Sequence, residues 1–133
     1  MKLSEMQNNP EVETEGVWQN YGGGLRVKIA RMSNPKYEEY LREQTKPHMR
    51  RLRSGNLEND VIEEITQKAM ARYILLNWEG LKDENDQEIP YSEKKAFELL
   101  SDPKYKDFYR DISDMSQDRS LFRSQALEEL AKY

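Results

Sequence analysis

The sequence predicts a mainly α-helical fold of four or five helices with a small N-terminal β-hairpin. Apolar residues recur at intervals of three and four in several segments after residue 33. Period-two alternation is confined to one short segment that follows three consecutive glycines. A length of 133 residues favours one domain. We therefore expect a disordered tail at residues 1–13, where little can be buried, and a single helical domain at 14–133.

The hairpin is predicted at residues 17–29. Leu25, Val27 and Ile29 alternate with polar residues, which places them on one face of a strand. The glycines at 22–24 permit the positive φ values of a tight turn after Val17–Tyr21. A flexible loop before a lone strand is the alternative.

The first helix is expected to begin near residue 34. Ser33 or Asn34 can cap it, and Pro35 fits its first turn. Pro47 interrupts it, and Ser54-Gly55-Asn56 ends the turns that follow. Its apolar positions are Tyr37, Tyr40 and Leu41.

The strongest pattern predicts one continuous helix from residue 57 to Gly80, which suits a C-terminal cap. The second half of this helix is richer in apolar residues, so we expect it to be more deeply buried. A polar connector follows at 82–90, with Ile89 as its apolar anchor. The stripe consists of Ile62, Ile65, Ala69, Tyr73 and Leu76, widened by Met70, Ile74, Leu75 and Trp78.

Three further helical segments complete the pattern. Ser92 can cap a helix that ends at Asp102-Pro103. The next helix covers about 104–115, and the last covers about 120–133. Their apolar positions are Ala96, Phe97, Leu99, Leu100, Tyr105, Phe108, Tyr109, Ile112, Leu121, Phe122, Ala126, Leu127 and Leu130.

Composition argues against several function classes. The net charge is −4, whereas proteins that hold phosphate backbones are usually basic. The chain has no cysteine, so disulfides, thiolate catalysis and cysteine metal sites are excluded. The N-terminus shows no signal-peptide pattern and no segment is apolar enough for a membrane span. We expect a protein of the cytoplasm with no membrane partner.

No motif predicts an enzyme, a cofactor or a metal site. His48 is the only histidine, and a metal site usually needs two or more nitrogen or sulfur ligands. An EF-hand loop starting at Asp83 would need glycine where Glu88 stands and glutamate where Lys94 stands. A solvated connector explains the acidic loop better.

The basic segment 46–53 is compatible with three interpretations. Arg50, Arg51 and Arg53 could hold phosphates, face an acidic protein surface, or simply be solvated. The acidic whole-chain charge makes nucleic acid the least favoured of the three.

The ordered motifs of residues 65–125 resemble the central region of tail assembly chaperones of long-tailed bacteriophages. The residues that carry the resemblance are Trp78-Glu79-Gly80, the acidic connector, Pro90-Tyr91-Ser92 after Ile89, and Asp102-Pro103. Glu88 or Gln87 stands where this family often has a turn glycine. The resemblance implies that the motif residues are structural and that the helix ends in Trp78-Glu79-Gly80-Leu81.

The resemblance also implies a function. It predicts a non-enzymatic protein of the bacterial host cytoplasm that binds and shields the tape-measure protein, contacts tail-tube subunits, and is absent from the mature virion. A homo-oligomer is possible. The alternatives are a head–tail connector or minor tail protein retained in the virion, and a nucleic-acid-binding regulator.

Partner binding would need apolar anchors outside the core. The candidate anchors are Tyr37, Tyr40, Leu41, Leu121, Phe122, Leu127 and Leu130. Burial of one such side chain contributes roughly 1.5–3 kcal/mol, so a few would suffice. The competing interpretation is that these residues close the core.

Overall fold

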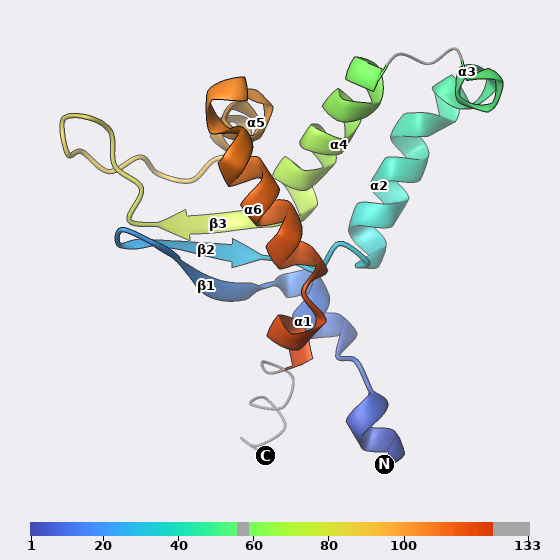
Figure 1. Cartoon of the computed structure of the whole chain (residues 1–133), viewed down its shortest axis with the longest axis horizontal. Helices are drawn as coiled ribbons and strands as arrows, with labels where there is room; N and C mark the ends of the chain where they lie inside the picture. The colour runs from blue at the N-terminus through green and yellow to red at the C-terminus, as the bar shows by residue number, and fades with distance from the viewer. Residues whose placement is uncertain (56–58, 124–133) are drawn as a thin grey trace.

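A three-stranded antiparallel sheet organises the chain in the computed structural model, which describes residues 1–55 and 59–123 (Figure 1). Strands β1 (Val17–Gly22) and β2 (Leu25–Ile29) form the predicted hairpin, from Val17 opposite Ile29 to Gly22 opposite Leu25. The third strand, β3 (Leu75–Glu79), pairs with β2, so the sheet order is β1-β2-β3. The hairpin prediction is confirmed, but the hairpin is only part of a larger sheet.

The prediction of one helix from 57 to Gly80 is wrong. Helix α4 (Asn59–Tyr73) ends at Tyr73, and the chain continues as β3. Trp78 lies opposite Val27 and Leu75 lies opposite Ile29. The backbone N–H and C=O groups of β3 form hydrogen bonds with β2 instead of the internal hydrogen bonds of a helix. The same pairing buries both Leu75 and Trp78 in the core. A short apolar run is compatible with either conformation, so tertiary pairing decides between them.

The fold is therefore mixed α+β, and the prediction of a mainly α fold with four or five helices and a small hairpin is wrong. Within the described ranges there are six α-helices beside the sheet. Residues 119–123 are also helical. In addition to α4, the helices are α1 (Pro10–Glu15), α2 (Pro35–Thr45), α3 (Met49–Ser54), α5 (Glu93–Ser101) and α6 (Lys106–Gln117), with 3-10 helices at Leu3–Met6, Lys46–His48 and Pro103–Tyr105.

Several predicted helix boundaries are confirmed. The Asn34 side chain accepts a hydrogen bond from the amide of Tyr37, and Ser92 Oγ accepts one from the amide of Lys95. Pro47 lies in a 3-10 turn that separates α2 from α3, because a proline cannot donate the next helical hydrogen bond. Asp102 follows the last residue of α5 and accepts from the amide of Lys104.

The core lies between the sheet and the helices. Helix α6 crosses one face of the sheet, and α4 packs beside both α2 and α5 (Figure 1). Where α6 crosses the sheet, Tyr21 of β1 packs edge-on against Phe108 of α6, with ring centroids 5.2 Å apart. The Tyr21 hydroxyl donates to Asp111 of α6 at 2.7 Å. The most buried side chains of α4 are Ala69, Met70 and Ala71, which confirms that its C-terminal part is the more deeply buried.

Residues 1–13, for which the sequence predicts a tail, include the first 3-10 helix and most of α1. Glu13 of α1 accepts a hydrogen bond from the Arg31 side chain at 2.6 Å. The two side chains are only 12% and 15% exposed, and the Glu13 carbonyl accepts from the Arg31 amide. These contacts attach α1 to the end of β2.

Gly80 gives a test of the three-stranded sheet. Its φ is +82°, and a Cβ at this position would collide with the carbonyl oxygen of Gly24 in the hairpin turn. Gly55 has a similar φ of +74° but nothing within 4 Å of an added Cβ. Gly55→Ala should cost only the left-handed backbone penalty, roughly 1–2 kcal/mol. Gly80→Ala should lower the unfolding free energy by roughly 1–3 kcal/mol more.

Urea denaturation of the two variants measures this difference. Equal losses for Gly80→Ala and Gly55→Ala would contradict the close approach of β3 to the hairpin turn, since the two residues differ mainly in that contact.

Raised tyrosine pKa values predict that the folded chain loses stability at alkaline pH. Burial raises the pKa of Tyr37 and of Tyr91 to about 12, and burial together with Asp111 raises the pKa of Tyr21 to about 12. The folded chain therefore holds these protons more tightly than the unfolded chain, in which the pKa is near 10. Stability from this source is complete below pH 10 and is lost as the pH rises toward 12.

The check is an ultraviolet titration of tyrosinate absorbance alongside unfolding at each pH. Tyr21, Tyr37 and Tyr91 should ionise late, as should Tyr109, whose pKa is also raised by burial. The free energy of unfolding should fall above pH 10. Titration of all eight tyrosines near pH 10 with no loss of stability would contradict the burial described for these side chains.

Candidate partner-binding groove

A solvent-open groove runs between α2 and α4 and extends toward α5. Its larger part has a volume of about 620 Å³, and an adjoining hollow of about 290 Å³ shares Tyr40 and Arg72 with it. We call the combined feature the aromatic groove. It is lined by Pro35, Lys36, Glu39, Tyr40, Arg42, Glu43, Lys68, Ala71, Arg72, Tyr73, Glu93, Lys94 and Phe97.

Asn34 fixes one end of the aromatic groove. Its side chain is 1% exposed and donates to the carbonyl of Arg31 at 2.6 Å and to the carbonyl of Tyr73 at 3.4 Å. Its Oδ1 accepts from the Tyr37 amide at the start of α2. One buried amide thus joins the first turn of α2 to the last residue of α4. The two helices run side by side from that joint (Figure 1), and residues of both line the groove.

The floor of the groove is aromatic. Tyr40 and Tyr73 meet edge-on, with ring centroids 5.5 Å apart and an interplanar angle of 61°. Phe97 of α5 continues the floor on the other side of α4. All three rings are half-buried, so each retains surface that a partner could cover.

Two cations of α4 lie over these rings. The Arg72 Cζ is 5.5 Å from the Tyr40 ring centre and 5.4 Å from the Tyr73 ring centre. The Lys68 Nζ is 5.9 Å from the Phe97 ring centre. A cation over a ring face is attracted by the ring quadrupole. Both cationic side chains remain about half exposed, at 53% and 51%, so they can still bind an anion.

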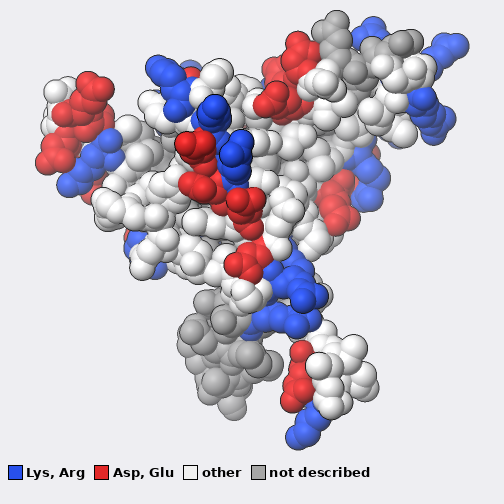
Figure 2. Space-filling view, viewed as in Figure 1, with Lys and Arg blue, Asp and Glu red and all other residues white. Residues whose placement is uncertain are grey.

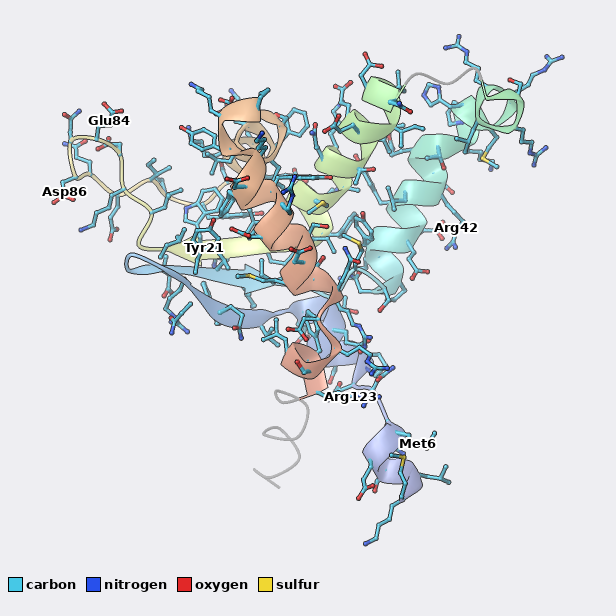
Figure 3. All side chains as sticks on the ribbon, viewed as in Figure 1. Met6, Tyr21, Arg42, Glu84, Asp86 and Arg123 are labelled. Atoms are coloured by element: carbon cyan, nitrogen blue, oxygen red, sulfur yellow. The ribbon has the colours of Figure 1, made fainter. Side chains whose placement is uncertain are left out.

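The outer wall of the groove carries an ion pair. Arg42 Nη2 donates to Glu39 Oε2 at 2.7 Å, and this contact lowers the pKa of the Glu39 carboxyl below its usual value. Figure 3 shows Arg42 projecting from α2. Both side chains are more than half exposed, so the pair contributes little to stability. It does set the polarity of the α2 wall.

The sequence-predicted anchors are distributed over different environments. Tyr40 lines the aromatic groove. Tyr37 and Phe122 are 3% and 2% exposed and belong to the core. Leu41 and Leu121 are half-buried and pack against that core. Leu127 and Leu130 lie outside the residues that the structure describes.

Sequence reasoning did not identify the rest of the groove. The helical periodicity places Phe97 and Tyr73 among the apolar positions of their helices, and it gives no role to Lys68 or Arg72. A detectable pattern existed: Lys68 and Arg72 stand one turn apart on α4, and Arg72 directly precedes Tyr73. Only the packing of α2 and α5 on α4 shows that this pattern borders one groove.

Of the residues that carry the resemblance to tail assembly chaperones, Trp78 and Tyr91 meet at the junction of β3 and α5, where they form a structural clasp. Trp78 Nε1 donates to the Ile89 carbonyl at 2.8 Å, and Tyr91 donates to the Leu75 carbonyl at 2.8 Å. The Trp78 and Tyr91 rings meet edge-on at 4.8 Å. Pro90 lies between Ile89 and Tyr91, the two connector residues that make these hydrogen bonds. Gly80 directly follows β3, and Ser92 caps α5. Glu79 pairs with Arg26 across the sheet at 3.3 Å.

The charged segments outside the groove are exposed. Arg50, Arg51 and Arg53 of α3 are all exposed, and basic side chains gather at the α3 end of the molecule (Figure 2). Glu84 and Asp86 lie at the outer end of the connector (Figure 3). Residues 1–55 and 59–123 contain no group of three or more acidic or histidine side chains placed to hold a metal. In the same ranges, no helix has the length and hydropathy that a bilayer span requires.

Comparison with known proteins identifies the family. The model of the YdaY prophage protein family matches residues 32–133, which covers α2 to α6, β3 and the whole aromatic groove. No curated protein and no solved structure matches the chain. Because the match spans well over half of the 133 residues, the chain belongs to the YdaY prophage protein family.

Proposed function

We propose that this prophage protein is a tail assembly chaperone that binds the tape-measure protein and shields its apolar helices during assembly of the tail tube. The aromatic groove is the observation that carries the proposal. It offers three half-buried rings along α4 that are accessible to a partner. Prophage membership and the tail-chaperone-like motifs around Trp78 and Tyr91 support the same conclusion.

The mechanism is reversible burial of apolar surface. A tape-measure helix that lays one face on Tyr40, Tyr73 and Phe97 removes apolar area from water on both partners. Each well-buried side chain contributes roughly 1.5–3 kcal/mol, from which the cost of association is subtracted. A small number of contacts therefore gives binding that arriving tail-tube subunits can displace. The mechanism uses no bond-making group, and it takes place in the host cytoplasm.

Co-expression tests the shielding step. The tape-measure protein of the same prophage should be largely insoluble when it is expressed alone, because its apolar helices self-associate. With this chain present, its soluble fraction should rise several-fold, as measured by sedimentation and densitometry. A matched culture expressing an unrelated acidic protein of similar size serves as the control. Equal solubility in the two cultures would refute the proposal.

The composition of the virion distinguishes an assembly chaperone from a structural protein that is retained in the particle. After prophage induction, mass spectrometry of purified particles should find the tape-measure protein without this chain, which should instead appear in the infected-cell lysate. Stoichiometric copies in mature particles would identify a head–tail connector or minor tail protein.

A further inference from the structure

The aromatic groove has a charge opposite to that of the chain as a whole. Its lining contains five basic and three acidic side chains, whereas the full sequence carries a net charge of −4. Arg42 is paired with Glu39, and Lys68 is paired with Glu64 of the same helix at 3.3 Å. Arg72 makes a longer contact with Glu93, at 3.7 Å. Both of the last two pairs are about half exposed, so a partner carboxylate can compete for either cation at little cost. Within the described residues, Lys36 and Lys94 make no ion pair. The groove therefore combines apolar rings with spare positive charge.

The positive charge is arranged along the helix axis. Lys68 and Arg72 are four residues apart on α4, a separation of about 6 Å along the axis. Each lies over a ring of the floor, Lys68 over Phe97 and Arg72 over Tyr40 and Tyr73. A helix lying along α4 would place its own side chains at the same spacing. Two carboxylates three or four residues apart on that helix could meet both cations.

We propose that the aromatic groove selects an amphipathic helix whose apolar stripe is bordered by carboxylates. The stripe packs on Tyr40, Tyr73 and Phe97, and the carboxylates pair with Lys68 and Arg72. This inference rests on the proposed function for the identity of its partner, the tape-measure protein, and it adds the chemistry that the partner helix must carry.

The acidic side chains of the lining argue against a polyphosphate as the occupant. Glu39, Glu43 and Glu93 stand on the walls of the groove, where a continuous phosphate backbone would meet them repeatedly. A helix can avoid them, because its carboxylates occupy chosen positions. The pattern of charge thus fits discrete carboxylates better than a nucleic-acid strand.

Two designed 18-residue helical peptides provide the probe. Both carry the same leucine stripe at positions i, i+3, i+4 and i+7, and the residues bordering the stripe are glutamate in one and lysine in the other. Fluorescence anisotropy with the full chain measures their affinities. The glutamate peptide should bind roughly tenfold more tightly at low ionic strength, since two partly exposed charge pairs distinguish the peptides. High salt should reduce this preference.

Charge reversal tests whether Lys68 and Arg72 cause the preference for the glutamate peptide. The double variant K68E/R72E should reverse the order of the two peptides. The matched control K104E/K106E makes the same change in net charge at two exposed lysines outside the groove and should leave the order unchanged. Tyr40→Ala should weaken both peptides. Circular dichroism and urea unfolding of each variant establish that it is folded before its affinity is interpreted.

Three outcomes would overturn the inference: equal or tighter binding of the lysine peptide, an equal effect of the control reversal, or displacement of the glutamate peptide from the groove by single-stranded DNA.

The results also separate the inference from the proposed function. If the peptide preference holds but the tape-measure protein stays insoluble, the proposed function fails and the groove assignment stands. If K68E/R72E and Tyr40→Ala solubilise the tape-measure protein as well as the parent chain does, the groove assignment fails and the function stands.

Discussion

The pairing of β3 with β2 is the constraint on which the rest of the structure depends. It ends α4 at Tyr73 and places Trp78 opposite Val27. Because Trp78 is held in the sheet, its indole can donate to the Ile89 carbonyl, and the connector returns to the core at that point. Tyr91 then anchors to the Leu75 carbonyl, and α5 starts beside α4. Without this strand, Phe97 would not lie on the same groove as Tyr40.

The aromatic groove follows from two local joints. Asn34 ties the start of α2 to the end of α4, and the clasp of Trp78 and Tyr91 sets where α5 begins. Between these joints, the surface of α4 presents Lys68 and Arg72 over aromatic rings. In the unbound protein the cations cover part of the ring surface, which limits exposed apolar area while leaving it available to a partner. Such a surface suits temporary contact better than permanent assembly, as the proposed chaperone role requires.

Local features of the fold could be predicted from the sequence, whereas its tertiary pairing could not. The glycines at 22–24 and the caps at Asn34 and Ser92 act through neighbouring backbone groups, so their positions indicate hairpin and helix ends directly. The run Ile74–Trp78 satisfies both helix and strand patterns, and only the free edge of β2 selects the strand. The same limit applied to the site: Tyr40 was identified from its helix, but Phe97 and Arg72 become groove residues only when α2 and α5 pack on α4.

Site-specific photocrosslinking during prophage induction tests partner binding at the aromatic groove most directly. A photoreactive phenylalanine analogue would replace Tyr40 in the groove, or Tyr105, which is 45% exposed and lies outside it. Mass spectrometry would identify the crosslinked protein. Our account predicts crosslinks to the tape-measure protein from position 40 and few or none from position 105. Tape-measure crosslinks from position 105 alone, or none from either position while both proteins are present in the cell, would contradict it.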